Sequence, residues 1–152
     1  MTSKLQTEIK QTKPFENFKE EVLLNLARTA AVVGHELEHK LRPHGLSSTQ
    51  YNVLRILRGA GPAGLCQYEI RDRLVAEVPD VPRILTRMEK AHWIRRERGS
   101  SDRRVVMASI TKEGLRLLEE IDGQMTAWSG AAFQKLSGEQ IQQLNELLVL
   151  AR

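Results

Sequence analysis

The chain has 152 residues, enough for one domain with a buried core, and its single cysteine, Cys66, excludes an internal disulfide and a cysteine-based zinc site. Lysine and arginine number 23 against 19 aspartates and glutamates, an excess that permits a polyanionic partner without requiring one. Residues 1–13 lack the apolar core of a signal peptide, and no apolar run approaches membrane-spanning length, so we expect a cytoplasmic protein without a membrane segment.

The N-terminal third predicts an arm followed by a long helix. Residues 1–13 form the arm, in which Leu5 and Ile9 could dock as one helical turn against a partner. Pro14 suits the first position of a helix. Apolar residues then recur every three or four positions: Phe15, Phe18, Val22, Leu26, Ala30, Val33, Leu37 and Leu41. This amphipathic helix should end before Pro43, with a turn at Gly45.

The middle of the chain predicts a helix-turn-helix followed by a two-stranded hairpin. Ser47 or Ser48 caps a helix with Tyr51, Leu54 and Leu57 on its buried side, and the glycine-rich residues 59–64 end it. Leu65 is a candidate third strand. Helices are expected over residues 67–74 and from Asp80 to about His92, with strands on either side of residues 99–104. This order is typical of a winged helix-turn-helix, mainly α with a small β-hairpin.

The C-terminal residues predict two more helices. Thr111 opens the first, whose apolar stripe continues to Ala132, and Ser137 caps the second, with Gln140 completing a capping box. Residues 14–45 and 112–152 have more apolar surface than the winged helix at 46–111 can cover, so we expect dimerisation helices around one compact domain, and a homodimer. The alternative is that these helices pack on each other within one subunit.

The second helix of the motif carries a basic stripe. Asp80, Arg83, Arg87 and Lys90 fall at helical spacing on one face, whereas Ile84, Leu85 and Met88 take the other side. Arginine suits a DNA major groove because its fork can bond guanine O6 and N7 together or clamp a phosphate. The alternative is an ordinary solvated face with Glu89 nearby.

The predicted hairpin is also basic. Five arginines lie close together in it: Arg95, Arg96, Arg98, Arg103 and Arg104. Arg95 and Arg96 point to opposite faces of a strand, and Asp102 precedes Arg104 by two residues, so its carboxylate could orient that guanidinium toward a minor groove. The alternative is a surface ion pair contributing at most about 1 kcal/mol. Gln67 and Tyr68, at a helix N-terminus, are candidate phosphate contacts.

Three segments together resemble the MarR (multiple antibiotic resistance regulator) family of transcription factors. They are residues 46–54 (Leu-Ser-Ser-Thr-Gln-Tyr-Asn-Val-Leu), Asp102-Arg103-Arg104, and residues 109–114 (Ser-Ile-Thr-Lys-Glu-Gly). The resemblance covers roughly residues 26–148. It implies a homodimer on a pseudo-palindromic operator, a repressor released by a small ligand, with Arg104 in the minor groove beside Asp102 and residues 79–87 in the major groove.

The sequence departs from the family where the recognition helix begins and ends. Hydroxyl residues are usual at its start, but this chain has Pro79, Asp80, Val81 and Pro82. If the helix began at Pro79, Pro82 would leave a carbonyl of the first turn unsatisfied. We prefer Asp80 as the N-cap, which places Pro82 in the first turn, where proline is tolerated. His92 and Trp93 replace what is commonly glycine and a small apolar residue, and Trp93 is expected to plug the core under the hairpin.

Three modes of regulation remain open. The family resemblance implies an effector pocket, for which the candidates are Arg42, His44, Tyr51, Arg55 and Trp93. His35 and His39 lie one helical turn apart in a His-Glu-x-x-His pattern, so they are weak candidates for a regulatory metal site with His44. Cys66, at a helix start, is a candidate thiol sensor, although the default is a small buried residue.

The remaining classes of function are weaker. A zinc protease would need a third ligand and an open cleft around the two histidines, and no Ser-His-Asp set, phosphate-binding glycine loop or paired-carboxylate site is evident. We therefore expect no enzyme and no cofactor. A winged helix can also serve as a protein-interaction module without DNA binding, but the arginines of the motif argue against this.

Overall fold

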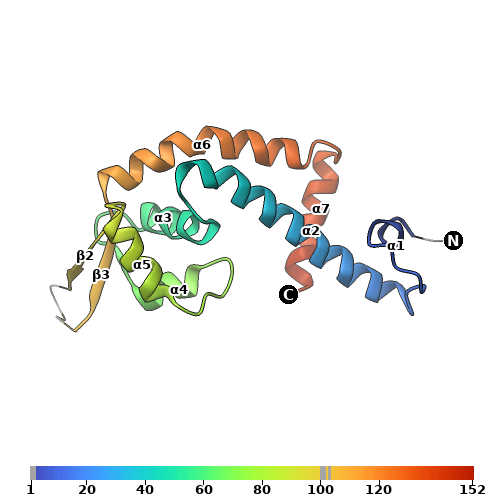
Figure 1. Cartoon of the computed structure of the whole chain (residues 1–152), viewed down its shortest axis with the longest axis horizontal. Coiled ribbons are helices and arrows are strands. Elements are labelled where there is room, and N and C mark those ends of the chain that lie inside the picture. The colour runs from blue at the N-terminus through green and yellow to red at the C-terminus, as the bar shows by residue number, and fades with distance from the viewer. Residues whose placement is uncertain (1–2, 100–101, 103) are drawn as a thin grey trace. The chain divides into compact units, whose positions relative to one another are not determined.

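The computed structural model describes residues 3–99, 102 and 104–152, and the chain divides into two compact units, Met1–Ser48 and Thr49–Arg152. The sequence had predicted one compact domain. The first unit contains α1 (Lys4–Glu8) and α2 (Phe18–Leu41), both labelled in Figure 1, and the 3-10 turn η1 (Arg42–His44). Of the 24 residues of α2, only Leu41 is buried, so this long helix contributes little to a core within its own unit.

The start of α2 differs from the prediction. The helix begins at Phe18 because the Asn17 side chain accepts a hydrogen bond from the Glu20 N–H, which leaves Pro14 outside it. It ends before Pro43 as expected, and Gly45 has the left-handed φ of 72° that favours glycine. Residues 4–8 of the predicted arm form α1, whose Leu5 is buried.

The second unit is a winged helix-turn-helix continued by two helices. Its elements are α3 (Ser48–Ala60), β1 (Leu65–Cys66), α4 (Gln67–Arg73), α5 (Val81–Lys90), β2 (Ile94–Arg98), β3 (Val106–Ile110), α6 (Lys112–Ala132) and α7 (Gly138–Leu150). The strands form one antiparallel sheet in the order β1-β3-β2, which confirms the predicted strand at Leu65. The predicted fold class, mainly helical with a small hairpin, is confirmed.

The core of the second unit takes apolar side chains from every element of the winged helix. The largest fully buried ones are Val53, Leu54 and Leu57 of α3, Ile70 of α4, Met88 of α5, Ile94 of β2, and Leu118 and Ile121 of α6; Leu65 of β1 and Ala108 of β3 are also buried. At the edge of this core, the guanidinium of Arg58 on α3 donates to the carboxylate of Asp122 on α6 at 2.6 Å. That hydrogen bond raises the pKa of Arg58 and ties α6 to the helix-turn-helix.

The last two helices are capped as the sequence predicted. The Thr111 hydroxyl accepts from the Gly114 N–H at the start of α6, and Ser137 and Gln140 form a reciprocal capping box at the start of α7. No residue of α7 is buried: Leu147 is 62% exposed and Leu150 is 81% exposed. Among the described residues, no helix combines the length and apolarity needed to cross a membrane.

Gly64 supplies a test of the sheet. It has a φ of +67°, and a Cβ at this position would lie 2.2 Å from the carbonyl oxygen of Ala108 on β3. We expect Gly64→Ala to lower the free energy of unfolding by more than about 2 kcal/mol, because the new methyl group pushes β1 off β3 and the backbone is strained. Urea unfolding followed by circular dichroism measures this change.

Gly123→Ala is the matched control. Gly123 lies inside α6, and a Cβ added there would meet nothing within 4 Å, so the same substitution should stabilise the chain by roughly 0.5–1 kcal/mol. Equal unfolding midpoints for the two variants would contradict the close approach of β1 and β3.

Candidate nucleic-acid interface

The first helix of the motif, α4, begins with a capped turn. The Glu69 carboxylate accepts a hydrogen bond of 2.8 Å from the Cys66 N–H, and this bond holds the pKa of Glu69 below its ordinary value. Tyr68 is exposed, and the guanidinium of Arg71 lies over its ring at 5.4 Å from the centroid. Gln67 and Tyr68 therefore stand at the helix start, where the sequence placed them.

The second helix, α5, has a well-defined start. Asp80 is the N-cap, and its carboxylate accepts from the Arg83 N–H at 3.0 Å, which confirms the preferred interpretation of this sequence. Pro82 falls in the first turn, where its missing N–H has no intrahelical partner to lose. The cap also corrects one expectation: the Asp80 carboxylate is engaged by the helix backbone rather than projecting with the basic side chains.

The sides of α5 differ sharply in character. Val81, Leu85 and Met88 are buried, and Ile84 is half-buried beside them. Arg83, Arg87 and Lys90 lie along the opposite side, where all three are exposed. The helix ends at Lys90, two residues earlier than predicted, because His92 adopts a left-handed φ of 61°. Glycine tolerates that φ best, which gives a physical reason for the family's usual glycine there.

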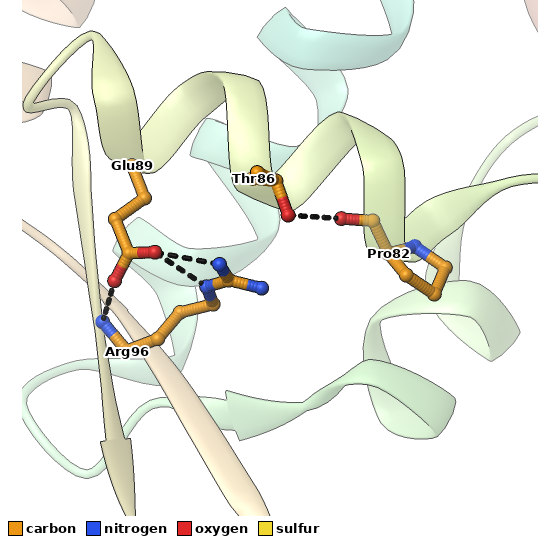
Figure 2. Close-up of polar contacts among 4 residues, drawn as sticks. All are labelled: Pro82, Thr86, Glu89 and Arg96. Carbon is orange, nitrogen blue, oxygen red and sulfur yellow. Dashed lines mark hydrogen bonds and ion pairs between the residues drawn. The ribbon is translucent and has the colours of Figure 1, made fainter.

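A third side of α5 carries a contact that the sequence analysis missed (Figure 2). The guanidinium of Arg96 on β2 donates from Nε and Nη2 to Oε2 of Glu89, at 2.9 and 2.6 Å, and the Arg96 backbone N–H donates to Oε1 at 3.2 Å. The hydrogen bond from the Arg96 side chain lowers the pKa of Glu89. The Arg96 guanidinium, one of the five arginines that make the hairpin basic, is therefore engaged by Glu89.

The other hairpin arginines are distributed as follows. Arg95 lies on the opposite face of β2 from Arg96, as strand alternation predicted, and its Nε donates to the Ser109 hydroxyl at 3.0 Å. Arg98 is exposed at the end of β2. Arg104 is exposed within the turn that precedes β3, and Arg103 lies outside the described residues.

Asp102 acts differently from the prediction. Its carboxylate accepts from the backbone N–H of Arg104 at 2.9 Å, and its carbonyl accepts from the Val105 N–H at 3.1 Å. Gly99 N–H bonds the Val105 carbonyl at 2.8 Å and closes the hairpin. Asp102 therefore orders the backbone that carries Arg104, whereas the sequence had predicted that it orients the guanidinium directly.

The base of the hairpin is tied to α6. The carbonyls of His92 and Trp93 accept from the Thr111 hydroxyl at 2.6 Å and from the Thr111 N–H at 3.0 Å. Trp93 is half-buried, so it is only partly the core plug that was expected.

The candidates for regulation are spread along the chain. Arg42 and His44 belong to the first unit, and Tyr51, Arg55 and Trp93 to the second, where the Arg55 guanidinium lies 5.8 Å from the centre of the Tyr51 ring. A hollow of about 380 Å³ in the described part of the second unit is lined by none of these residues, but by Arg58, Gly61, Pro62, Arg95, Lys112, Leu115 and residues 109–111. The effector pocket stays a prediction.

The structure adds little to the candidates for a metal site and for a thiol sensor. His35 and His39 lie on α2, and within residues 3–99, 102 and 104–152 no three His, Cys, Asp or Glu side chains gather to hold a metal ion. Cys66 is a half-buried free cysteine that precedes α4. Both regulatory alternatives therefore stand as the sequence left them.

Taken together, a capped helix with one cationic side and a hairpin with exposed arginines define a winged helix-turn-helix transcriptional regulator. Comparisons with known proteins identify the family. A family model described as "MarR family" matches residues 46–106. The uncharacterized HTH-type transcriptional regulator YwoH of Bacillus subtilis (strain 168) is 36% identical over 98 residues, which cover 64% of this chain and 69% of that protein.

Solved structures agree with this assignment. A MarR transcription factor from Planctomyces limnophilus is 30% identical, with a TM-score of 0.69 over 90% of this chain and 99% of that chain. Sco3205, a MarR family regulator from Streptomyces coelicolor crystallised in complex with DNA, is 24% identical with a TM-score of 0.75, covering 93% of this chain and 90% of its own. The chain belongs to the MarR family of DNA-binding transcriptional regulators.

The capping carboxylate of α4 predicts a pH dependence. Because the folded-state pKa of Glu69 is lowered from 4.5, its stabilising bond to Cys66 N–H is present above that pH and is lost as the pH falls further. Between pH 5 and about pH 3, we expect the free energy of unfolding to fall less for Glu69→Gln than for the wild type. Urea unfolding at a series of pH values measures this, and parallel pH profiles for the two proteins would contradict the assignment.

Proposed function

We propose that this chain is a homodimeric repressor that binds a pseudo-palindromic operator, with α5 of each subunit in a major groove and each hairpin at the neighbouring minor groove. The observation that carries the proposal is the division of α5 into a buried apolar side and an opposite side bearing Arg83, Arg87 and Lys90. Because its apolar side packs in the core, the helix can present its cationic side to a groove while the core stays intact.

The hairpin supports the same interpretation. Arg98 is exposed at the end of β2 and Arg104 is exposed in the turn, where a minor groove with its negative potential would attract them. Gln67 and Tyr68, at the start of α4, are proposed to contact phosphates. The relative Sco3205 was crystallised in complex with DNA, which is consistent with a DNA-binding role for this fold.

Dimerisation is proposed from uncovered apolar side chains. α7 buries none of its residues, and Phe18 and Leu23 on α2 are mostly exposed. Exposed apolar surface on such helices is typical of an interface between subunits. Two recognition helices related by a twofold axis then match half-sites about 10 base pairs apart. Release by a small ligand rests on the family resemblance alone.

Arginine substitutions test the DNA-binding assignment. A binding sequence is first selected from a random duplex pool, and affinities are then measured by fluorescence anisotropy over a range of salt concentrations. Arg104→Ala and Arg87→Ala should each weaken binding by about 1–3 kcal/mol, because each removes a guanidinium from a groove or phosphate contact.

Arg116→Ala is the control, since Arg116 is also a surface arginine but lies on α6, outside the helix-turn-helix and hairpin. Its affinity should stay near that of the wild type. Binding should weaken steeply with salt. Wild-type affinity in both Arg87→Ala and Arg104→Ala, or binding that is insensitive to salt, would refute the proposal and favour a protein-interaction module.

A substitution on α7 tests the dimer. Leu147→Glu should shift the protein from dimer to monomer in sedimentation velocity, because a charge at an apolar interface is costly. Gln143→Glu adds the same charge at an exposed polar position of the same helix and should leave the dimer intact. A dimer that survives Leu147→Glu would place the subunit contact elsewhere.

A further inference from the structure

We propose that Glu89 and Arg96 are a positioning pair, which fixes the hairpin against the recognition helix so that operator affinity depends on two side chains that do not touch DNA. This inference rests on the proposed function of α5 and the hairpin, and it gives Arg96 a role outside the set of proposed DNA contacts.

The contact geometry supports a positioning role. One carboxylate holds both the side chain of Arg96 and its backbone N–H, in three hydrogen bonds of 2.6 to 3.2 Å (Figure 2). A bond to the side chain alone would let β2 slide while the arginine followed. The bond to the backbone N–H fixes the strand itself relative to the last turn of α5, and the fork of the guanidinium fixes its angle.

The place of the pair along the strand shows what it controls. Ile94, Arg96 and Arg98 share one face of β2, because side chains alternate along a strand. Ile94 is buried, Arg96 is half-buried and Arg98 is exposed. Arg98 therefore follows about 6.6–6.8 Å beyond the pair on the same face. Fixing β2 at Arg96 sets where Arg98 and the hairpin turn lie relative to Arg87 and Lys90.

The place of Glu89 on the helix also suggests position rather than stability. A carboxylate in the last turn of a helix is disfavoured by the helix dipole, so Glu89 gains nothing from α5 itself. The Arg96 and Glu89 side chains are 27% and 38% exposed, and ion pairs this open to water contribute little to folding. What the pair supplies is a defined angle between α5 and β2.

The two roles of Arg96 predict opposite signs for one substitution. If Arg96 bound a phosphate, Glu89 would compete with DNA for its guanidinium and repel the phosphates. Glu89→Gln would then tighten binding. If the pair positions the hairpin, Glu89→Gln weakens binding even though it removes a negative charge from a DNA-binding surface, because the hairpin is no longer held at its angle.

The experiment measures operator affinity for the wild type, Glu89→Gln, Arg96→Lys and Glu97→Gln in the full-length protein on the selected duplex. Glu97→Gln is the matched control, because Glu97 is an exposed glutamate on the neighbouring position of the same strand, 3.8 Å from Arg95. Glu89→Gln should weaken binding by about tenfold, whereas Glu97→Gln leaves it equal or tighter. Arg96→Lys keeps the charge but lacks the fork, so it should resemble Glu89→Gln.

Each outcome has one meaning. Tighter or unchanged binding by Glu89→Gln, or wild-type binding by Arg96→Lys, overturns the positioning role while leaving the proposed function intact. A wild type that fails to bind any selected duplex overturns the proposed function, and the inference with it. Hydrogen exchange tests the contact between Glu89 and Arg96 in the absence of DNA. The backbone amide of Arg96 should exchange faster in Glu89→Gln than in the wild type, while the urea midpoint stays unchanged. Equal exchange rates would contradict the positioning role.

Discussion

The winged helix depends on how α5 is held along two of its sides. Val81, Leu85 and Met88 bury one side in the core, and Glu89 on the adjoining side bonds β2. Apolar burial is strong but non-directional, so it fixes the depth of the helix better than its angle to the hairpin. The directional bonds of Glu89 supply that angle. The remaining side, with the cations, is open to a partner because the other two are occupied.

Three acidic residues of this basic region share one arrangement. Asp80, Glu89 and Asp102 each accept a hydrogen bond from the backbone N–H of an arginine, at 3.0, 3.2 and 2.9 Å. These carboxylates cap the helix, hold the strand and order the turn. For Arg83 and Arg104, the hydrogen bond to the carboxylate comes from the backbone N–H and does not involve the guanidinium. The acids therefore shape the backbone under the cationic surface as well as reducing its net charge.

Local patterns predicted most of the fold, whereas contacts between elements were harder to predict. The Asp80 cap, the tolerated Pro82 and the strand at Leu65 follow from rules that span a few residues. Predicting the pairing of Glu89 with Arg96 requires knowing that α5 packs beside β2. Helical phase and strand alternation indicate only the side of each element on which these residues lie. The start of α2 was missed because the capping strength of Asn17 outweighed the preference of Pro14 for a first helical turn.

Chemical protection of the two grooves tests the central claim most directly. Dimethyl sulfate methylates guanine N7 in the major groove and adenine N3 in the minor groove. On the selected duplex, the account predicts two patches of guanine N7 protection about one helical turn apart, each beside a patch of adenine N3 protection. Protection confined to one groove, or spread evenly along the duplex, would contradict the arrangement of helix and hairpin described above.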